Sequence, residues 1–449
     1  MSKKYKTSKV GRFTQLAKGI GKASFQFVKE KSEQKINNVM TGKKIDEKIA
    51  QIKATKELVK TMSNMKGAVM KVGQMLSITD NLFLPKEITD LFKSLQKNSS
   101  NSLKEEEIDE IFFDNFNKKT LQIFDHFEYK PFAAASIGQV HKATYKGHDV
   151  VVKIQYPYIK DTIHSDLDAL TTLETLIRKI YKNIPDISQG IEEIKDNFVL
   201  ECDYLNEVKN MSHLKKSLKK RFPQIIVPTP YKEVCSDNII TMSYEQGYSF
   251  DELAKKDQTL KNNIGTTLYE FFLFSLFELK FIHADPQNGN YLFQDDKIIL
   301  LDFGCCKKFK KGFIENYSLL CYSVEIGDKQ LFKYAATKLG IFQKHYTDKE
   351  LDRYYKLTKD VYGPFTKKGA YQMPDLNPFQ LINSFFKEIR TLKDRKMPNK
   401  DLLLLDRANV GLFTKLKTLK VSIDWSQARD EFQSPITQEA YNKYKEKNK

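Results

Sequence analysis

The sequence predicts an α+β fold, in which a helical region precedes a group of strands and a second, mostly helical region follows. Apolar residues recur at three- and four-residue steps between residues 46 and 78, as in an amphipathic helix. The period changes near Phe127, after which β-branched runs at 140–145 and 150–155 surround a glycine-containing turn. Helical patterns then dominate to about Trp425. With 449 residues, of which 41% are hydrophobic, the chain can bury several cores, so a disordered chain is excluded.

Residues 1–40 form a basic amphipathic segment. The first 29 residues contain no acidic side chain, and Phe13, Leu16, Ile20 and Phe27 form one apolar stripe if the segment is helical. Such a helix can lie on an anionic membrane surface, whereas a solvated tail and a mitochondrial targeting peptide are the other interpretations. We expect no nucleic-acid partner, because only the net charge of +17 favours one and no nucleic-acid-binding motif is present.

The cysteines and the apolar runs indicate the compartment. The five cysteines form no C-x-x-C pair, and their odd number indicates reduced thiols in a cytosol-like compartment. The most apolar run, 264–279, contains Glu270 and Glu278 and is shorter than the roughly 20 residues of a membrane span. The sequence therefore predicts a cytoplasmic protein with peripheral membrane contact, with a mitochondrial location as the alternative.

Three further regions follow the basic segment. Residues 41–120 are predicted to be a helical extension, 121–245 a strand-containing lobe with inserted helices, and 246–449 a helical lobe. Within them we predict helices and strands at the following positions: helices over 46–78, from Pro85, and over 103–116, 158–181 and 188–218; strands over 140–145, 150–155, 239–244 and 298–301.

A lysine and three carboxylates are the first candidate site residues. Lys153 follows three valines, and burial of its ammonium group is costly unless the group is paired. In the predicted helix over 188–218, Asp203 and Glu207 share a face at a spacing of four, while Glu201 projects from another side. Taken singly, these residues favour the other interpretations, an edge-strand lysine and a solvated acidic face.

Two loops downstream carry the next candidates. After His283, Asp285 and Asn290 stand five residues apart, which is the spacing of a phosphoryl-transfer catalytic loop. Asp302 opens a D-F-G triplet directly after an apolar strand, where a carboxylate can hold Mg²⁺ against nucleotide phosphates. Either loop alone is consistent with an ordinary polar turn.

The four motifs occur in the order found in protein kinases, and each residue type meets a chemical need. Lys153 offers charge to the phosphates and Glu207 holds the lysine, while Asn290 and Asp302 offer oxygens to a metal ion. Asp285 can accept a proton from the phosphate acceptor. The sequence therefore predicts ATP and Mg²⁺ as cofactors, with Asp285 and Lys153 as catalytic residues.

Three motifs distinguish the sequence from protein kinases. No G-x-G-x-x-G precedes Lys153, and an alanine-rich run with Ser136 stands in its place; no A-P-E follows the D-F-G triplet. A K-x-G-Q motif at 71–74 lies near the end of the first long helix. With these motifs the sequence resembles the UbiB atypical kinase-like family, which is linked to coenzyme Q biosynthesis.

The resemblance implies a two-lobed protein-kinase-like fold, with a helical N-terminal extension carrying K-x-G-Q laid over the active-site cleft. It assigns regulatory roles to Lys71, Gly73, Gln74, Glu201 and Asp203. We place nucleotide contacts at Ala133, Ala134, Ala135, Ser136, Lys153, Glu207 and Tyr244.

The resemblance further implies an ATPase or phosphotransferase of unknown acceptor, acting at a membrane surface in ubiquinone or related isoprenoid-lipid metabolism. Expected partners are an anionic or quinone-containing membrane and lipid-biosynthesis enzymes. The alternatives are a nucleotide-binding scaffold for lipid-modifying enzymes, or a protein kinase. In the catalytic loop Gln287 and Asn288 replace the family's usual His and Pro, but Asp285 and Asn290 are retained, so we expect activity to be retained.

Overall fold

The computed structural model describes residues 102–135, 137–157, 159, 199–342, 347–372 and 399–447. The chain divides into two compact units, one comprising 1–205 and 231–243 and the other 206–230 and 244–449. The predicted helices over 46–78, from Pro85 and over 158–181 lie outside the described residues, as do the K-x-G-Q motif and Ser136.

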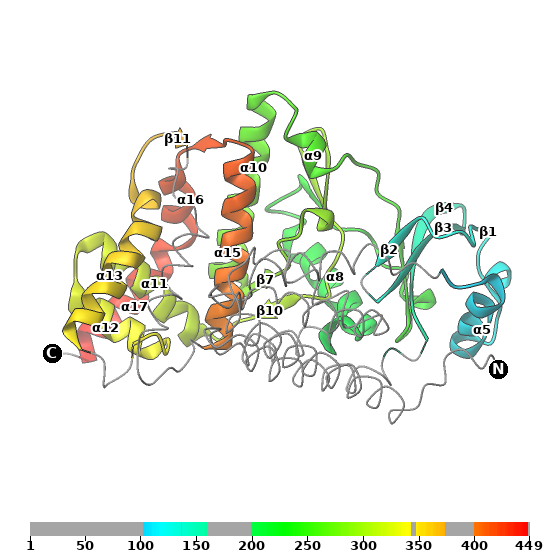
Figure 1. The fold of residues 1–449 in the computed structure, drawn as a ribbon, viewed down its shortest axis with the longest axis horizontal. Helices are drawn as coiled ribbons and strands as arrows, with labels where there is room; N and C mark the ends of the chain where they lie inside the picture. The colour runs from blue at the N-terminus through cyan, green and yellow to red at the C-terminus, as the bar shows by residue number, and fades with distance from the viewer. Residues whose placement is uncertain are drawn as a thin grey trace, which may run out of the picture. The chain divides into compact units, whose positions relative to one another are not determined.

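The first unit contains an antiparallel sheet with strand order β1-β3-β4-β6, in which β2 also pairs with β3. The strands are β1 (His126–Phe127), β2 (Ala133–Ala135), β3 (Gly138–Tyr145), β4 (His148–Gln155) and β6 (Ile239–Ser243). Lys146 and Gly147 both have positive φ at the β3–β4 turn, the conformation that tight hairpins favour. The predicted strands over 140–145, 150–155 and 239–244 are confirmed (Figure 1).

Helix α5 (Glu105–Phe116), predicted over 103–116, covers one face of this sheet. Its Phe112 meets Phe124 edge to face, with ring centroids 5.6 Å apart. Val150, Val152 and Ile154 belong to the same core cluster. Because side chains alternate along a strand, Lys153 projects from the opposite face of β4.

The second unit begins with α8 (Tyr204–Leu218), which crosses the boundary between units, and its described residues contain three small sheets. One has the order β5-β9-β8, another pairs β7 with β10, and the third pairs β11 with β12. The strands are β5 (Ile225–Ile226), β7 (Phe281–His283), β8 (Tyr291–Gln294), β9 (Lys297–Leu300) and β10 (Cys306–Lys308). The segment 206–230, expected in the first lobe, lies in the second unit because β5 pairs with β9.

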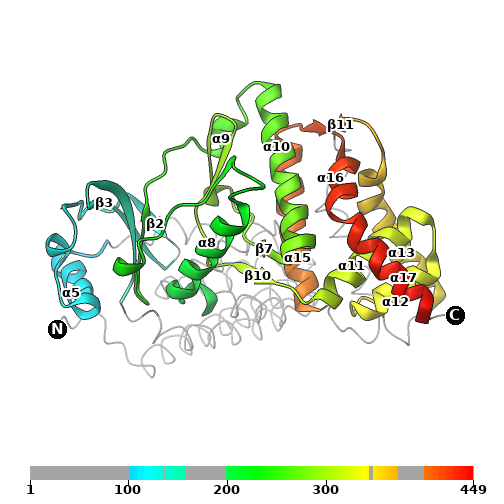
Figure 2. The ribbon, with the colours of Figure 1, turned by 180° about the vertical axis from the view of Figure 1, so that it is seen from behind.

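Helices make up most of what is described in the remainder of the second unit. They are α9 (Phe250–Leu253), α10 (Gln258–Leu273), a π-helix (Phe274–Leu279), α11 (Lys311–Ile326), α12 (Lys329–Lys338), α13 (Asp348–Tyr362), α15 (Lys400–Thr418), α16 (Trp425–Phe432) and α17 (Ser434–Lys447). Two residues form each strand of the β11–β12 pair, Tyr371–Gln372 and Ser422–Ile423. Helices α10 and α15 run side by side, as Figure 2 also shows. Helical structure continues past Trp425, where it was expected to end, because Trp425 and Phe432 anchor α16 in the core.

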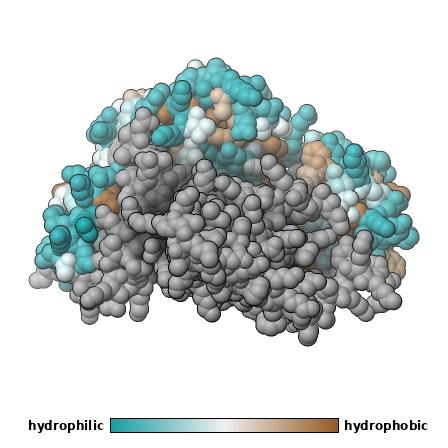
Figure 3. All heavy atoms as spheres, in the orientation of Figure 1, coloured by the Kyte–Doolittle hydropathy of each residue, from teal (hydrophilic) through white to brown (hydrophobic). Residues whose placement is uncertain are grey.

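Within the described ranges no helix combines the length and apolarity that a membrane crossing requires. The coloured part of the face drawn in Figure 3 is mostly hydrophilic, with scattered apolar residues. All five cysteines are free thiols, as the sequence predicts.

Candidate active site

Lys153 lies on a central strand of the first unit's sheet. It stands opposite Val140 of β3 and Ile240 of β6, so the edge-strand interpretation is wrong. Its side chain is only 7% exposed, and its Nζ lies 5.0 Å from the ring centroid of Tyr204. A cation over an aromatic face offsets part of the cost of burial. The structure therefore confirms a buried lysine.

The alanine-rich run forms a strand where a loop was expected. Ala133 pairs with Val140, which pairs with Lys153, so these residues form one row across the sheet. Directly opposed residues project to the same face, and Ala133 therefore shares the face of Lys153. The run is a strand because its three alanines pair with Gly138–Val140 at the start of β3. Gly138 also lets β3 approach β4, since a Cβ there would overlap the Ile154 carbonyl oxygen.

The acidic residues do not all lie on one helix. The helix ends at Glu201, after which the Asp203 N–H donates to the Leu200 carbonyl at 3.1 Å. Asp203 is exposed and directly precedes α8, a position that aspartate favours. The expected shared helical face of Asp203 and Glu207 is therefore wrong. Glu201 and Glu207 are both buried, at 6% and 1% exposure.

Two strand ladders in the second unit bring the catalytic-loop motif and the D-F-G triplet together. His283 stands opposite Cys306 in the β7–β10 pair, and the Ala284 N–H donates to the Cys305 carbonyl at 2.8 Å. In the β8–β9 pair, the Leu301 N–H donates to the Asn290 carbonyl at 3.1 Å. Asp285 follows β7, Asn290 directly precedes β8, and Asp302 lies between β9 and β10. The two ladders therefore bring the loops that carry these residues together.

Hydrogen bonds hold the D-F-G backbone in place. His283 Nε2 contacts the Asp302 carbonyl oxygen, and the Gly304 N–H donates to Asp302 Oδ1 at 2.9 Å. Asn210 Nδ2 donates to the Phe303 carbonyl at 3.0 Å, and the Phe303 N–H donates weakly to Glu207 Oε1 at 3.5 Å. Neither contact of α8 with Phe303 follows from the sequence.

The loop side chains suit a hard metal ion. Asp285 and Asn290 are half-buried. The Asn290 Nδ2 has no hydrogen-bond partner among the described residues, so no hydrogen bond of that atom to them fixes the orientation of the amide. Mg²⁺ prefers carboxylate and amide oxygens and takes its other ligands from phosphates and water. Among the described residues there is no group of three or more His, Cys, Asp or Glu side chains that could hold a metal ion.

Tyr244, assigned to the nucleotide site, is half-buried directly after β6 and belongs to the second unit. Ala133 and Ala134 are exposed and Ala135 is half-buried. The structure thus groups Asp285, Asn290, Asp302 and Glu207 in one unit and places Lys153, Glu201, Asp203 and the alanines in the other.

Two cations of α15 contact the catalytic loop, and neither is among the predicted site residues. Arg407 Nη2 donates to the Ala284 carbonyl at 3.3 Å, and Lys415 Nζ donates to the Pro286 carbonyl. Lys415 lies within an apolar helical stretch, and a charged residue at a core position is the pattern that could have indicated it.

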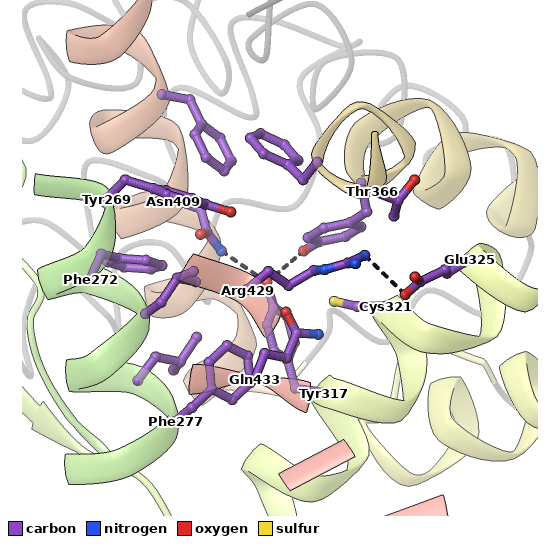
Figure 4. Close-up of a pocket in the computed structure, with 15 residues that line it drawn as sticks. Tyr269, Phe272, Phe277, Tyr317, Cys321, Glu325, Thr366, Asn409, Arg429 and Gln433 are labelled. Atoms are coloured by element: carbon purple, nitrogen blue, oxygen red, sulfur yellow. Dashed lines mark hydrogen bonds and ion pairs between the residues drawn. The ribbon is translucent and has the colours of Figure 1, made fainter. Parts of the chain in front are cut away.

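A separate cavity of about 50 Å³ lies among the helices of the second unit (Figure 4). Asn409 Nδ2 donates to the Tyr317 hydroxyl at 3.0 Å, and the Tyr317 and Tyr362 hydroxyls are 2.7 Å apart. Arg429 pairs with Glu325 at 3.0 Å. None of the predicted site residues lines it, so we interpret it as a polar network within the helical core.

The chain is similar to known proteins over most of its length. The family model described as the ABC1 atypical kinase-like domain matches residues 94–335. The chain is 28% identical over 457 residues to the probable serine/threonine-protein kinase abkA of Dictyostelium discoideum, covering 93% of this chain and 77% of that protein. It is 34% identical over 281 residues to the atypical kinase COQ8, mitochondrial, of Saccharomyces cerevisiae, covering 62% of this chain and 56% of that protein.

A further relative is the atypical kinase COQ8B, mitochondrial, of Danio rerio, at 29% identity over 329 residues, 72% of this chain and 51% of that protein. The chain thus matches about half the length of these COQ8 relatives. Among solved structures, the Rv3197–erythromycin complex from Mycobacterium tuberculosis matches with a TM-score of 0.57 and 21% identity, over 85% of this chain and 95% of that chain. This likeness confirms the mixed α+β fold.

Proposed function

The chain belongs to the ABC1 atypical kinase-like family, also known as UbiB, and from this premise we propose that it is a Mg²⁺-dependent ATPase or phosphotransferase. A kinase-like domain implies nucleotide binding, and relatives of this chain are named as kinases. The transferred group would be the γ-phosphoryl of ATP, passed to water or to another acceptor.

One observation carries the proposal: the β7–β10 and β8–β9 ladders place Asp285, Asn290 and Asp302 on loops at adjoining strand ends. Such a constellation is what phosphoryl transfer requires, because its catalysis is mainly positioning and charge stabilisation. Lys153, which is buried in the first unit, is the residue that the motif order assigns to phosphate charge.

Each residue then has a role in the proposed reaction. The Asp302 carboxylate and the Asn290 amide oxygen would hold Mg²⁺, which would neutralise phosphate charge. Asp302 Oδ1 is already engaged by the Gly304 N–H, which fixes the carboxylate orientation. Asp285 accepts the proton of the attacking hydroxyl or water, and Lys153 binds phosphate oxygens.

We further propose that the protein acts at a membrane surface in ubiquinone or related isoprenoid-lipid metabolism. The COQ8 relatives, named as mitochondrial atypical kinases, support this link, and the basic segment 1–40 offers a contact for anionic lipid. Lipid-biosynthesis enzymes are the expected protein partners. Cytoplasmic and mitochondrial locations both accord with peripheral contact.

The test is ATP hydrolysis by the purified full chain with Mg²⁺, with and without anionic liposomes. We expect hydrolysis to rise with liposomes, to stop with EDTA, and to fall by at least about 100-fold in Asp302→Asn, which weakens the metal site. Asp296→Asn is the matched control, because Asp296 is an exposed residue at the β8–β9 turn, and it should hydrolyse ATP like the wild type.

Hydrolysis that persists in Asp302→Asn would refute the assignment of the site. Nucleotide binding without hydrolysis under any condition would instead favour the scaffold alternative, in which ATP binding alone controls the assembly of lipid-modifying enzymes. Against the protein-kinase alternative, the sequence has neither a glycine-rich loop before Lys153 nor an A-P-E triplet after the D-F-G triplet. Phosphorylation of added protein substrates would support it nonetheless.

A further inference from the structure

One face of α15 lies against the catalytic loop. Arg407, Gly411 and Lys415 are spaced four residues apart, so they follow one another along a single face of the helix. Figure 1 shows α15 beside β7 and β10, the strands that carry the catalytic loop and the D-F-G segment.

The three residues contact the backbone on both sides of Asp285. Arg407 donates to the carbonyl of Ala284, the residue before Asp285, and also lies 3.2 Å from the sulfur of Cys305. Lys415 donates to the carbonyl of Pro286, the residue after Asp285. Gly411 stands between them, where an added Cβ would overlap the Pro286 ring. Helix α15 thus approaches the loop as closely as a glycine permits.

Lys415 is the least expected member of this face, because only 3% of it is exposed. Its Nζ also lies 4.7 Å from the ring centroid of Tyr291, the residue that follows Asn290. Lys415 therefore contacts the residue just after Asp285 and the residue just after Asn290. Burial lowers the pKa of Lys415 to about 8, while the negative charge of Asp285 acts in the opposite direction.

A buried lysine is expensive for a fold, and an apolar side chain of similar length is often at least as stable in its place. Its retention here is explained if the charge and the donor group set the catalytic loop. In the protein-kinase pattern H-R-D, the loop itself carries an arginine, whereas this chain has Ala284 at that position and brings its cations from α15.

We propose that Lys415 is a positioning residue, which, with Arg407 and Gly411, holds the backbone on both sides of Asp285 so that its carboxylate faces the phosphate acceptor. The inference rests on the proposed function, because the role of Asp285 belongs to it. Lys415 does not touch the nucleotide in this scheme and acts through the loop alone.

The kinetic test compares Lys415→Met with Lys415→Arg in Mg²⁺-dependent ATP hydrolysis by the full chain. A misplacement of about 1 Å can cost roughly 100-fold in rate, so we expect Lys415→Met to lower kcat by about 10- to 100-fold. KM for ATP should stay within about threefold, because the phosphates bind elsewhere. Lys415→Arg keeps a charge and donors, and a cavity of about 30 Å³ beside Lys415 gives room for the larger group, so it should restore most of kcat.

A merely structural role predicts different results. It would lower kcat, nucleotide affinity and Tm together in Lys415→Met, and this outcome would overturn the inference. An unchanged kcat in Lys415→Met would overturn it as well. Lys417→Met, on the same helix two residues away and thus on another side, is the control and should behave like the wild type.

Hydrogen exchange separates this inference from the proposed function. Amides of the segment 284–290 should exchange at least about fivefold faster in Lys415→Met than in the wild type or Lys417→Met, without any nucleotide. If the wild type hydrolyses no ATP, the proposed function fails, yet faster exchange would still show that Lys415 holds the loop. Unchanged exchange in Lys415→Met refutes the inference in either case.

Discussion

At the scale of single residues, the second unit keeps a carboxyl group in an unfavourable environment. Asp406 lies on α15 near Tyr317, Tyr362 and Cys321, and burial raises its pKa to about 7. The protonated form is therefore favoured by folding. Its stabilising contribution is fully present below the unfolded pKa of about 4 and is lost as the pH rises through about 7.

Asp406→Asn should remove this pH dependence, because the amide has a similar shape and does not titrate. The difference in unfolding free energy between the variant and the wild type should be about 2–3 kcal/mol more in favour of the variant at pH 8 than at pH 5. Each unit of pKa shift is worth about 1.4 kcal/mol. Urea unfolding at both pH values measures the difference. Asp360→Asn, at an exposed position on α13, is the control; an equal difference at both pH values for Asp406→Asn would contradict the assignment.

At the scale of elements, the helix ends show how local chemistry sets boundaries. The Asp328 carboxylate accepts hydrogen bonds from the N–H groups of Gln330 and Leu331, each at 2.9 Å, and so caps the start of α12. Helix α12 buries Leu331 and Phe332 completely, so its start must lie at this point for them to face the core. Asp203 occupies the corresponding position directly before α8.

Asp328→Ala should destabilise the fold by about 1 kcal/mol, because two helical N–H groups lose their acceptor. Thermal or urea unfolding measures the effect. Asp360→Ala places the same substitution in the last turn of α13, where a carboxylate is unfavourable and alanine is the better helix former, and should cost nothing. Equal stabilities of the two variants would mean that the Asp328 cap contributes no net free energy.

At the scale of the whole molecule, the net charge of +17 predicts attraction to anionic surfaces. The first 29 residues carry eight of the cations and no acid, so they concentrate this charge in one segment. Each cation near an anionic membrane contributes roughly 1 kcal/mol at most, and salt weakens the attraction.

Deletion of residues 1–29 should therefore weaken binding to anionic vesicles by at least about tenfold while leaving ATP affinity unchanged. Vesicle cosedimentation at low and high salt, with neutral vesicles as the control, measures the first effect, and nucleotide titration measures the second. If the deletion abolished both vesicle binding and ATP binding, the segment would be needed for the fold rather than for lipid contact.

Much of the fold follows from short-range patterns. The alternation of apolar residues and the Lys146–Gly147 turn predict the β3–β4 hairpin, and the helical period predicts α5. The motif spacing predicts Asp285, Asn290 and Asp302 as one constellation, which the strand ladders bring onto adjoining loops. The hairpin and α5 depend on neighbours within a few residues, where propensity and turn chemistry act directly.

By itself, the sequence predicted the β3–β4 hairpin, helix α5 and the kinase-like motif set, because each depends on a short sequence pattern. Only the tertiary structure decided that the chain ends one helix at Glu201 and starts another at Tyr204, that 206–230 belongs with β9, and that Lys415 meets Pro286, 129 residues away. Such contacts depend on which surfaces the packed core brings together. No local pattern encodes a partner at that distance, since packing and loop closure are properties of the whole chain.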